Sequence, residues 1–133
     1  MNEVMEFLGQ APAAFATLKE DKPRVRFLGF KMEDNGNLYF LTDKRKNVYQ
    51  ELVKNNNVEI CSFPNKDNHW IRIEGKVEFV EDVELNKKAF SILPILEQAY
   101  KSPDNENIVL LKIIDMNIRK YSMKGEEGTL SFN

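Results

Sequence analysis

The first part of the chain has the pattern of a short helix followed by a strand hairpin. Apolar residues recur at helical spacing over 4–8 and stop before Gly9 and Pro12, which favours a helix that ends there. An apolar run over 14–18 is followed by a polar turn and then by residues 24–27, where basic and apolar residues alternate in a strand that runs on toward residue 31. Two such runs around a turn predict antiparallel strands that pair as a hairpin.

A third strand and an amphipathic helix are predicted next. The Asn-Gly pair at 35–36 suits the positive φ angles of a tight hairpin turn, and the apolar run 38–42 follows it as a strand. Segment 44–54 is apolar on one face only, which predicts a helix with a basic start. Its charged residues, Glu51 among them, are placed mostly on the other faces. The predicted buried face consists of Val48, Leu52 and Val53.

The second half of the chain repeats the strand pattern around a helical segment. Runs rich in strand formers over 58–63 and 70–80 flank a polar turn, which predicts another antiparallel pair. Residues 82–100 return to helical spacing, with a kink or boundary at Pro94. The positions predicted to be buried there are Phe90, Leu93 and Leu96. The remaining predicted strands are 107–121 and 129–132.

This order of elements predicts a mainly β fold. Strands joined by hairpins, with few helices between them, favour an antiparallel barrel or sandwich over a doubly wound parallel sheet. The chain has 133 residues, of which 42% are hydrophobic and 30% charged. That length and apolar content fit one globular domain over 1–133 and exclude a disordered chain.

Charge and residue usage remove several functional classes. The net charge of −2 gives no overall positive field, so a general nucleic-acid binder is not expected. No apolar stretch is long enough to cross a bilayer, and 1–10 lacks the features of a secretory signal, so we expect a cytoplasmic protein. One cysteine, Cys61, and one histidine, His69, cannot form an internal disulfide or a tetrahedral zinc site by themselves. No metal site is therefore predicted.

A group of basic residues is the first candidate for chemistry. In a strand, Arg24 and Arg26 point to the same face, and 44–46 lies where the next helix is predicted to begin. Strand cations next to the positive end of a helix dipole form a socket suited to phosphate. The alternative is that both arginines belong to a solvated edge strand and that 44–46 is an ordinary exposed turn. The basic residues by themselves leave both interpretations open.

Longer runs of sequence carry a family resemblance. They are PRVRFLGFK at 23–31, LYFLTDKRKNVYQELVKNNNVEICSF at 38–63 and HWIRIEGKVEF at 69–79. Their order and spacing resemble the FMN-binding split-barrel family that includes pyridoxamine 5'-phosphate oxidase. Small members, the nitroimidazole-resistance and general-stress proteins, are the more similar branch. The resemblance implies an antiparallel split β-barrel of about six strands, of Greek-key type, with a few flanking helices.

The resemblance also implies a set of residues that bind FMN. Arg26 and Lys31 would stand at the two ends of a strand that lies along the flavin, and Arg45 with Lys46 would hold the phosphate. The strand backbone would supply donors and acceptors to the ring edge, and Trp70 would approach the ring. The full implied set is Arg26, Phe27, Leu28, Gly29, Lys31, Leu41, Thr42, Arg45, Lys46, Asn47 and Trp70.

The function that the resemblance implies is electron transfer by a homodimeric FMN protein. Its two sites would lie at the subunit interface, with a reduced nicotinamide, NADH or NADPH, as donor and a small molecule as acceptor. One alternative is a flavin-binding stress-response module without turnover, and another is a dimeric interaction domain without a cofactor. The tail 118–133 lacks the basic pattern with which the oxidase branch grips its substrate, which argues against vitamin B6 oxidation.

Overall fold

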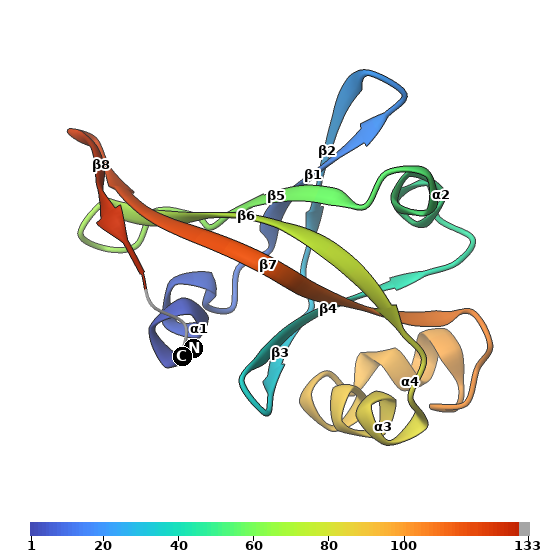
Figure 1. The fold of residues 1–133 in the computed structure, drawn as a ribbon. Coiled ribbons are helices and arrows are strands. Elements are labelled where there is room, and N and C mark those ends of the chain that lie inside the picture. Colours follow the sequence, from blue (N-terminus) through green and yellow to red (C-terminus); the bar gives the residue numbers. More distant parts are fainter. Residues whose placement is uncertain (131–133) are drawn as a thin grey trace.

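The computed structural model describes residues 1–130, in which eight strands form one antiparallel sheet with four short helices around it (Figure 1). No helix in this part of the chain is long and apolar enough to span a membrane. The elements in chain order are α1 (Asn2–Leu8), β1 (Ala13–Lys19), β2 (Lys22–Leu28), β3 (Lys31–Asp34), β4 (Asn37–Asp43), α2 (Asn47–Lys54), β5 (Asn57–Cys61), β6 (His69–Val80), α3 (Val83–Ile92), α4 (Ile95–Tyr100), β7 (Ile108–Ser122) and β8 (Gly125–Thr129).

The sheet curves so that its two end strands meet. The strand order is β2-β1-β5-β6-β7-β4-β3, with β8 added to β7, and every pairing is antiparallel. The end strands β2 and β3 are joined by Gly29 and Phe30 alone, and so short a link spans at most about 10 Å. The mainly β, antiparallel split-barrel prediction is confirmed, with eight strands in place of about six.

The core is divided between the two faces of β4. Leu38 and Phe40 pack into the larger cluster with β1, α2 and β6, whereas Tyr39 and Leu41 pack into a second cluster with α3 and α4. Figure 1 shows α3 and α4 together at one end of the long strands β6 and β7. A strand that is buried on both faces needs a continuous apolar run, which explains the composition of β4.

The predicted strand over 24–31 is two strands in the structure. β2 ends at Leu28 and pairs with β1, and β3 begins at Lys31 and pairs with β4. The chain therefore changes partner at Gly29 and Phe30. The alternation stops just before this point, because apolar residues stand at 25 and 27 and then at 28, 30 and 32. The change of partner therefore coincides with a shift in the phase of the pattern.

The helix predicted from residue 44 begins later. Residues 44–46 form a turn after β4, and Lys46 is the N-cap of α2. Two further predictions of burial in this helix are wrong, because Glu51 is buried and Val53 is exposed. In the helical segment 82–100, Leu96 is buried as predicted, but Leu93 at the break between α3 and α4 is exposed.

The predicted tail strand is displaced toward the N-terminus. β8 ends at Thr129, whereas the prediction began there and continued to residue 132. Leu130 is not part of a strand, although its N–H donates to the Ile118 carbonyl at 2.9 Å. The rest of the predicted strand, 131–132, lies outside the described residues.

We predict that Gly75→Ala destabilises the protein by about 1–3 kcal/mol, the usual range for overpacking. Gly75 sits at the irregularity of the β6–β7 pairing, where an added Cβ would lie 2.9 Å from the Ile114 carbonyl oxygen and 3.0 Å from Ile113 Cγ2. Urea unfolding measures the change. Gly29→Ala is the control, since nothing lies within 4 Å of its Cβ position. Equal unfolding midpoints for the two variants would contradict the prediction.

Candidate functional site

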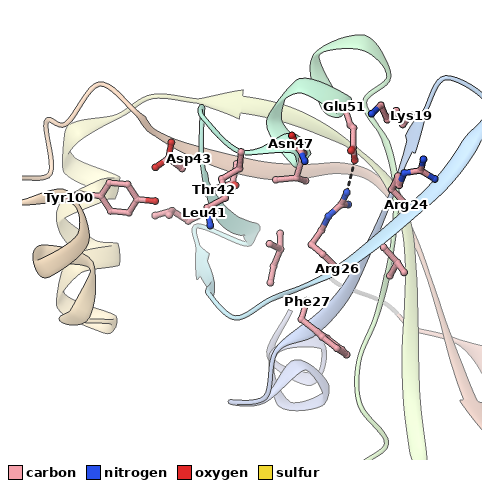
Figure 2. Close-up of a pocket in the computed structure, with 14 residues that line it drawn as sticks. Lys19, Arg24, Arg26, Phe27, Leu41, Thr42, Asp43, Asn47, Glu51 and Tyr100 are labelled. Carbon is pink, nitrogen blue, oxygen red and sulfur yellow. Dashed lines mark hydrogen bonds and ion pairs between the residues drawn. The ribbon is translucent and has the colours of Figure 1, made fainter.

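A cavity of about 630 Å³ lies between β2, the end of β4 and the start of α2 (Figure 2). One wall is formed by residues 24–28 of β2 and another by residues 41–43 of β4. The third is formed by residues 46–48 at the start of α2 and by Glu51 one turn further along the helix. The cavity therefore joins three segments that the chain order keeps apart. The lining is completed by Lys19 and Tyr100.

Arg26 is held inside this cavity by a closed set of hydrogen bonds. Its Nη2 lies 2.5 Å from Glu51 Oε1, and its Nη1 donates to Thr17 Oγ1 at 2.8 Å and to the Phe15 carbonyl at 3.0 Å. The Thr17 hydroxyl donates in turn to Glu51 Oε1 at 2.5 Å. Burial raises the pKa of Glu51, but the hydrogen bonds from Thr17 and Arg26 outweigh it, so this pKa lies below its usual value.

The second carboxylate of the cavity is also paired with an arginine. Arg45 donates from Nε and Nη2 to the two oxygens of Asp43, at 2.9 and 2.6 Å. Hydrogen bonding to Arg45 lowers the pKa of Asp43 to about 2, against the opposing effect of burial. The Arg45 side chain is 65% exposed and is not part of the cavity lining. The structure thus directs the Arg45 fork at Asp43.

Three cations of the cavity have no carboxylate partner within residues 1–130: Lys19, Arg24 and Lys46. Arg24 donates only to the carbonyl of its neighbour Pro23. Lys46 stands at the start of α2, where no side chain caps the helix and no acidic residue occupies the first turn. With Asp43 and Glu51 neutralised by arginines, the cavity is positive and suits an anion.

The edge of β2 forms one wall of the cavity. Within the described chain, β2 pairs only with β1, so the backbone N–H and C=O groups on its outer edge have no strand to bind. Residues 24–28, of which every second one directs its backbone groups to this edge, all line the cavity. Such an edge offers alternating donors and acceptors to a flat polar ligand.

The structure brings together most of the predicted residues and separates the others. Lys31 is buried elsewhere, where its Nζ donates to the carbonyls of Ala11 and Gly29, and burial lowers its pKa. Gly29 and Arg45 do not line the cavity. Those that do line it are Arg26, Phe27, Leu28, Leu41, Thr42, Lys46 and Asn47.

Trp70 lies in a second, apolar hollow. This hollow has a volume of about 380 Å³ and is bordered by Trp70, Phe27, Phe63 and Met123 among others. The Trp70 ring stacks on Tyr121 with 6.3 Å between ring centroids. Phe27 borders both the hollow and the cavity. Its ring points away from Arg26, the side chain that is directed into the cavity (Figure 2).

The sequence did not lead us to predict Thr17 and Glu51 as parts of the site. A signal for Glu51 existed, because it is three residues after Val48 and one before Leu52, which places it on the apolar face of the helix. A carboxylate on a buried face needs a partner. No local pattern identifies Thr17, whose role depends on the pairing of β1 with β2.

Cys61 and His69 lie outside the cavity. Cys61 borders the apolar hollow, and burial raises the pKa of its thiol, which disfavours a reactive thiolate. His69 Nδ1 lies 3.7 Å from a carboxylate oxygen of Glu127. Among residues 1–130 no three potential ligands are placed to hold a metal ion.

Comparison with known proteins identifies relatives for nearly the whole chain. A family model described as pyridoxamine 5'-phosphate oxidase matches residues 1–121. A NimC/NimA family protein from Clostridium acetobutylicum shares 30% identity over 98% of this chain and 93% of that chain, with a TM-score of 0.87. No curated protein matches the sequence.

Two further solved structures share the fold. General stress protein 26 from Bacillus anthracis is 25% identical, covers 97% of each chain and has a TM-score of 0.76. A protein related to general stress protein 26 from Clostridium acetobutylicum is 15% identical, covers 98% of this chain and 90% of that chain, and has a TM-score of 0.75. At the lower identity the likeness concerns the fold alone.

We expect Asp43→Asn to lower stability by roughly 2 kcal/mol at pH 7, because a carboxyl with a depressed pKa stabilises the fold while it is ionised. In the wild type this contribution is present above the unfolded-state pKa near 4 and is lost as the pH falls through about 2. Thermal unfolding from pH 7 to pH 2 should show the two proteins converging in acid. A difference that does not depend on pH would contradict the ionic role of Asp43.

Proposed function

Because the chain belongs to the pyridoxamine 5'-phosphate oxidase family, we propose that it binds FMN, with the phosphate of the cofactor in the cavity between β2, β4 and α2. The observation that carries this proposal is the combination of cations without carboxylate partners, an uncapped helix start and an open strand edge around one space. A phosphate monoester carries nearly two negative charges, which these groups match.

The phosphate would be bound at the α2 end of the cavity. Lys46 contributes a charge at the helix start, and Thr42 at the end of β4 contributes a hydroxyl beside it. Arg26 contributes a guanidinium from the opposite wall (Figure 2). Asn47 lines the same end of the cavity and offers amide donors and an acceptor.

The flat ring of the cofactor would lie along the open edge of β2. Backbone groups of 26–28 on this edge would donate to and accept from the polar edge of the ring. Phe27 and Trp70 would border its apolar part, because residue 27 lines both the cavity and the hollow that contains Trp70. When bound, the flavin supplies the ability to accept a hydride and to pass electrons on.

We propose that the protein is an oxidoreductase that passes electrons from NADH or NADPH to a small acceptor. Both carboxylates of the cavity are held by arginines, and hydride transfer to a flavin needs no protein base. The role of the protein would be to bind the phosphate, to orient the ring and to limit the access of water. A flavin-binding stress-response module without turnover is the second candidate, and the similarity to general stress protein 26 supports it.

Two measurements test the cofactor and the activity separately. Mass spectrometry of the ligand that is released when the purified protein is denatured should give the mass of FMN. Adding NADH or NADPH without oxygen should then bleach the flavin absorbance if the protein is an oxidoreductase. Bound FMN that neither nucleotide reduces would support the binding module, and a protein that does not bind added FMN would exclude both.

We expect Lys46→Ala to weaken FMN binding about tenfold and to leave riboflavin binding unchanged, because Lys46 would meet only the phosphate. Lys44→Ala is the matched control, since Lys44 is paired with Glu81 at 2.5 Å on the surface and is not part of the cavity lining. Flavin fluorescence titration gives the affinities. A larger loss in Lys44→Ala would show that the phosphate turn is misplaced.

The melting temperature of the flavin-free protein provides a second test of the role of Lys46, again with Lys46→Ala. Lys46 is the N-cap of α2, where a cation faces the positive end of the helix dipole. Without a bound anion, its removal should therefore not lower stability. A clear loss of stability in Lys46→Ala without FMN would indicate a structural role for this side chain.

We further propose that the protein is a homodimer and that the apolar hollow is part of its interface. Val25 and Phe27 of β2 are 69% and 61% exposed, and Met123 at the turn before β8 is 82% exposed. Phe63 stacks on Phe27 with 5.5 Å between centroids and is itself half exposed. Phe27, Phe63 and Met123 border the hollow, and Val25 lies beside it on β2. Exposed apolar side chains gathered in this way are typical of a surface that another protein covers.

Light scattering should give twice the mass of one chain, and Met123→Glu should shift the protein toward the monomer by placing a charge in the interface. Ile95→Glu is the comparison, because Ile95 is an exposed apolar residue on α4, in the other exposed apolar group of the molecule. If Ile95→Glu separates the subunits and Met123→Glu does not, the interface lies at α3 and α4 instead.

A further inference from the structure

Arg26 binds its carboxylate differently from two other arginines of this protein. Arg45 and Arg72 donate from Nε and Nη2 to carboxylate oxygens, Arg45 to Asp43 and Arg72 to Glu59. Arg26 instead uses Nη1 and Nη2, and its Nε has no partner among the described residues. Arg45 and Arg72 bind their carboxylates through the Nε–Nη2 edge of the guanidinium. In Arg26 this edge is not used as a pair, because Nε donates to none of the described residues.

The count of donors shows what Arg26 has left. A guanidinium has five N–H groups in a planar arrangement. Three are used inside the protein, two of Nη1 for the Phe15 carbonyl and Thr17 Oγ1, and one of Nη2 for Glu51. The remaining two are the Nε–H and one Nη2–H, which point in nearly the same direction. This is the fork with which arginine binds two oxygens of a carboxylate or a phosphate.

The internal hydrogen bonds also fix the direction of that fork. Thr17 Oγ1 accepts from Arg26 Nη1 and donates to Glu51 Oε1, which accepts from Arg26 Nη2, so the three side chains form a closed ring. Thr17 on β1 is 3% exposed, and the Glu51 side chain on α2 is 9% exposed. Anchored at two buried groups on different elements, the guanidinium cannot rotate without breaking the ring.

We propose that Thr17 and Glu51 are positioning residues that hold Arg26 with its Nε–Nη2 edge available to bind a phosphate monoester. This proposal rests on the proposed function, in which that phosphate belongs to FMN. It explains why a carboxylate stands in a cavity that suits an anion. Glu51 and Thr17 occupy the adjacent Nη1–Nη2 edge of the guanidinium. Because Nη2 carries two N–H groups, one can donate to Glu51 while the other, together with Nε–H, binds the phosphate.

The charge of the cavity favours a dianion over a singly charged carboxylate ligand. Once Arg26 and Glu51 are counted as a neutral pair, and Asp43 is balanced by Arg45, the cations Lys19, Arg24 and Lys46 still line the same space. A dianionic phosphate can bind the fork of Arg26 and the ammonium group of Lys46 together. A ligand with one negative charge would balance only one of these three cations, whereas a dianion balances two.

The test compares FMN with riboflavin in three variants of the full chain. Thr17→Val keeps the shape of the side chain and removes the hydroxyl, whereas Thr17→Ser keeps the hydroxyl. Arg26→Lys keeps the positive charge opposite Glu51 but cannot form the fork. The quantity measured is the ratio of FMN affinity to riboflavin affinity, by flavin fluorescence titration. A merely structural role would change both affinities and leave this ratio unaltered.

We expect this ratio to fall about tenfold in Arg26→Lys, the size of one lost charge-assisted hydrogen bond, and about threefold to tenfold in Thr17→Val. It should stay close to the wild-type value in Thr17→Ser. An unchanged ratio in Thr17→Val, or an equal fall in Thr17→Val and Thr17→Ser, would overturn the role of the Thr17 hydroxyl. An unchanged ratio in Arg26→Lys would overturn the role of the fork.

Inorganic phosphate separates this proposal from the function on which it rests. If the wild type binds neither flavin, the proposed function fails, and the fork is then judged by the rise in melting temperature that inorganic phosphate produces. The positioning proposal predicts that this rise is present in the wild type and in Thr17→Ser. It should be reduced in Thr17→Val and Arg26→Lys, and an equal rise in all four proteins would overturn it.

Discussion

The pairing of β6 with β7 determines the position of almost every other part of the fold. β6 also pairs with β5, while β7 pairs with β4 and β8, so the two long strands join the halves of the sheet. The pairing passes through an irregularity at Gly75, where the backbone of β7 comes too close for a side chain. β4 is positioned by its pairing with β7. The cavity wall that β4 provides therefore also depends on the pairing of β6 with β7.

The sequence predicts those parts of the fold in which pattern and burial coincide. In β6, Ile71 and Ile73 are buried while Glu74 is exposed, as their alternation predicts. At the break between β2 and β3 the apolar positions shift from 25 and 27 to 28, 30 and 32. Such a shift does not say which strand lies alongside, so the change of partner could not be predicted from it. The burial of Glu51 follows from helical spacing but conflicts with the rule that charge faces water, and the ion pair with Arg26 resolves that conflict.

The basic residues of the site differ in how far sequence could define them. Lys46 and Thr42 are brought to one cavity by local connections, since the turn after β4 leads directly into α2. The orientation of Arg26 depends on Thr17 and Glu51, which belong to other elements, so no local pattern contains it. For Arg45 the sequence-based prediction placed the side chain at the phosphate, but its partner in the structure is Asp43, only two residues away. Paired with Asp43, Arg45 is not part of the cavity lining.

The burial of β4 on both faces has a consequence for the growing chain. Leu38 of β4 pairs with Ile113 of β7, so more than half of the protein must be synthesised between the two partners. At roughly 5–20 residues per second, β4 waits several seconds on the ribosome without β7 at its edge and without α3 and α4 over Tyr39 and Leu41. During this interval β3, β1 and α2 are available to the strand, but the edge that β7 will occupy is open to wrong pairing.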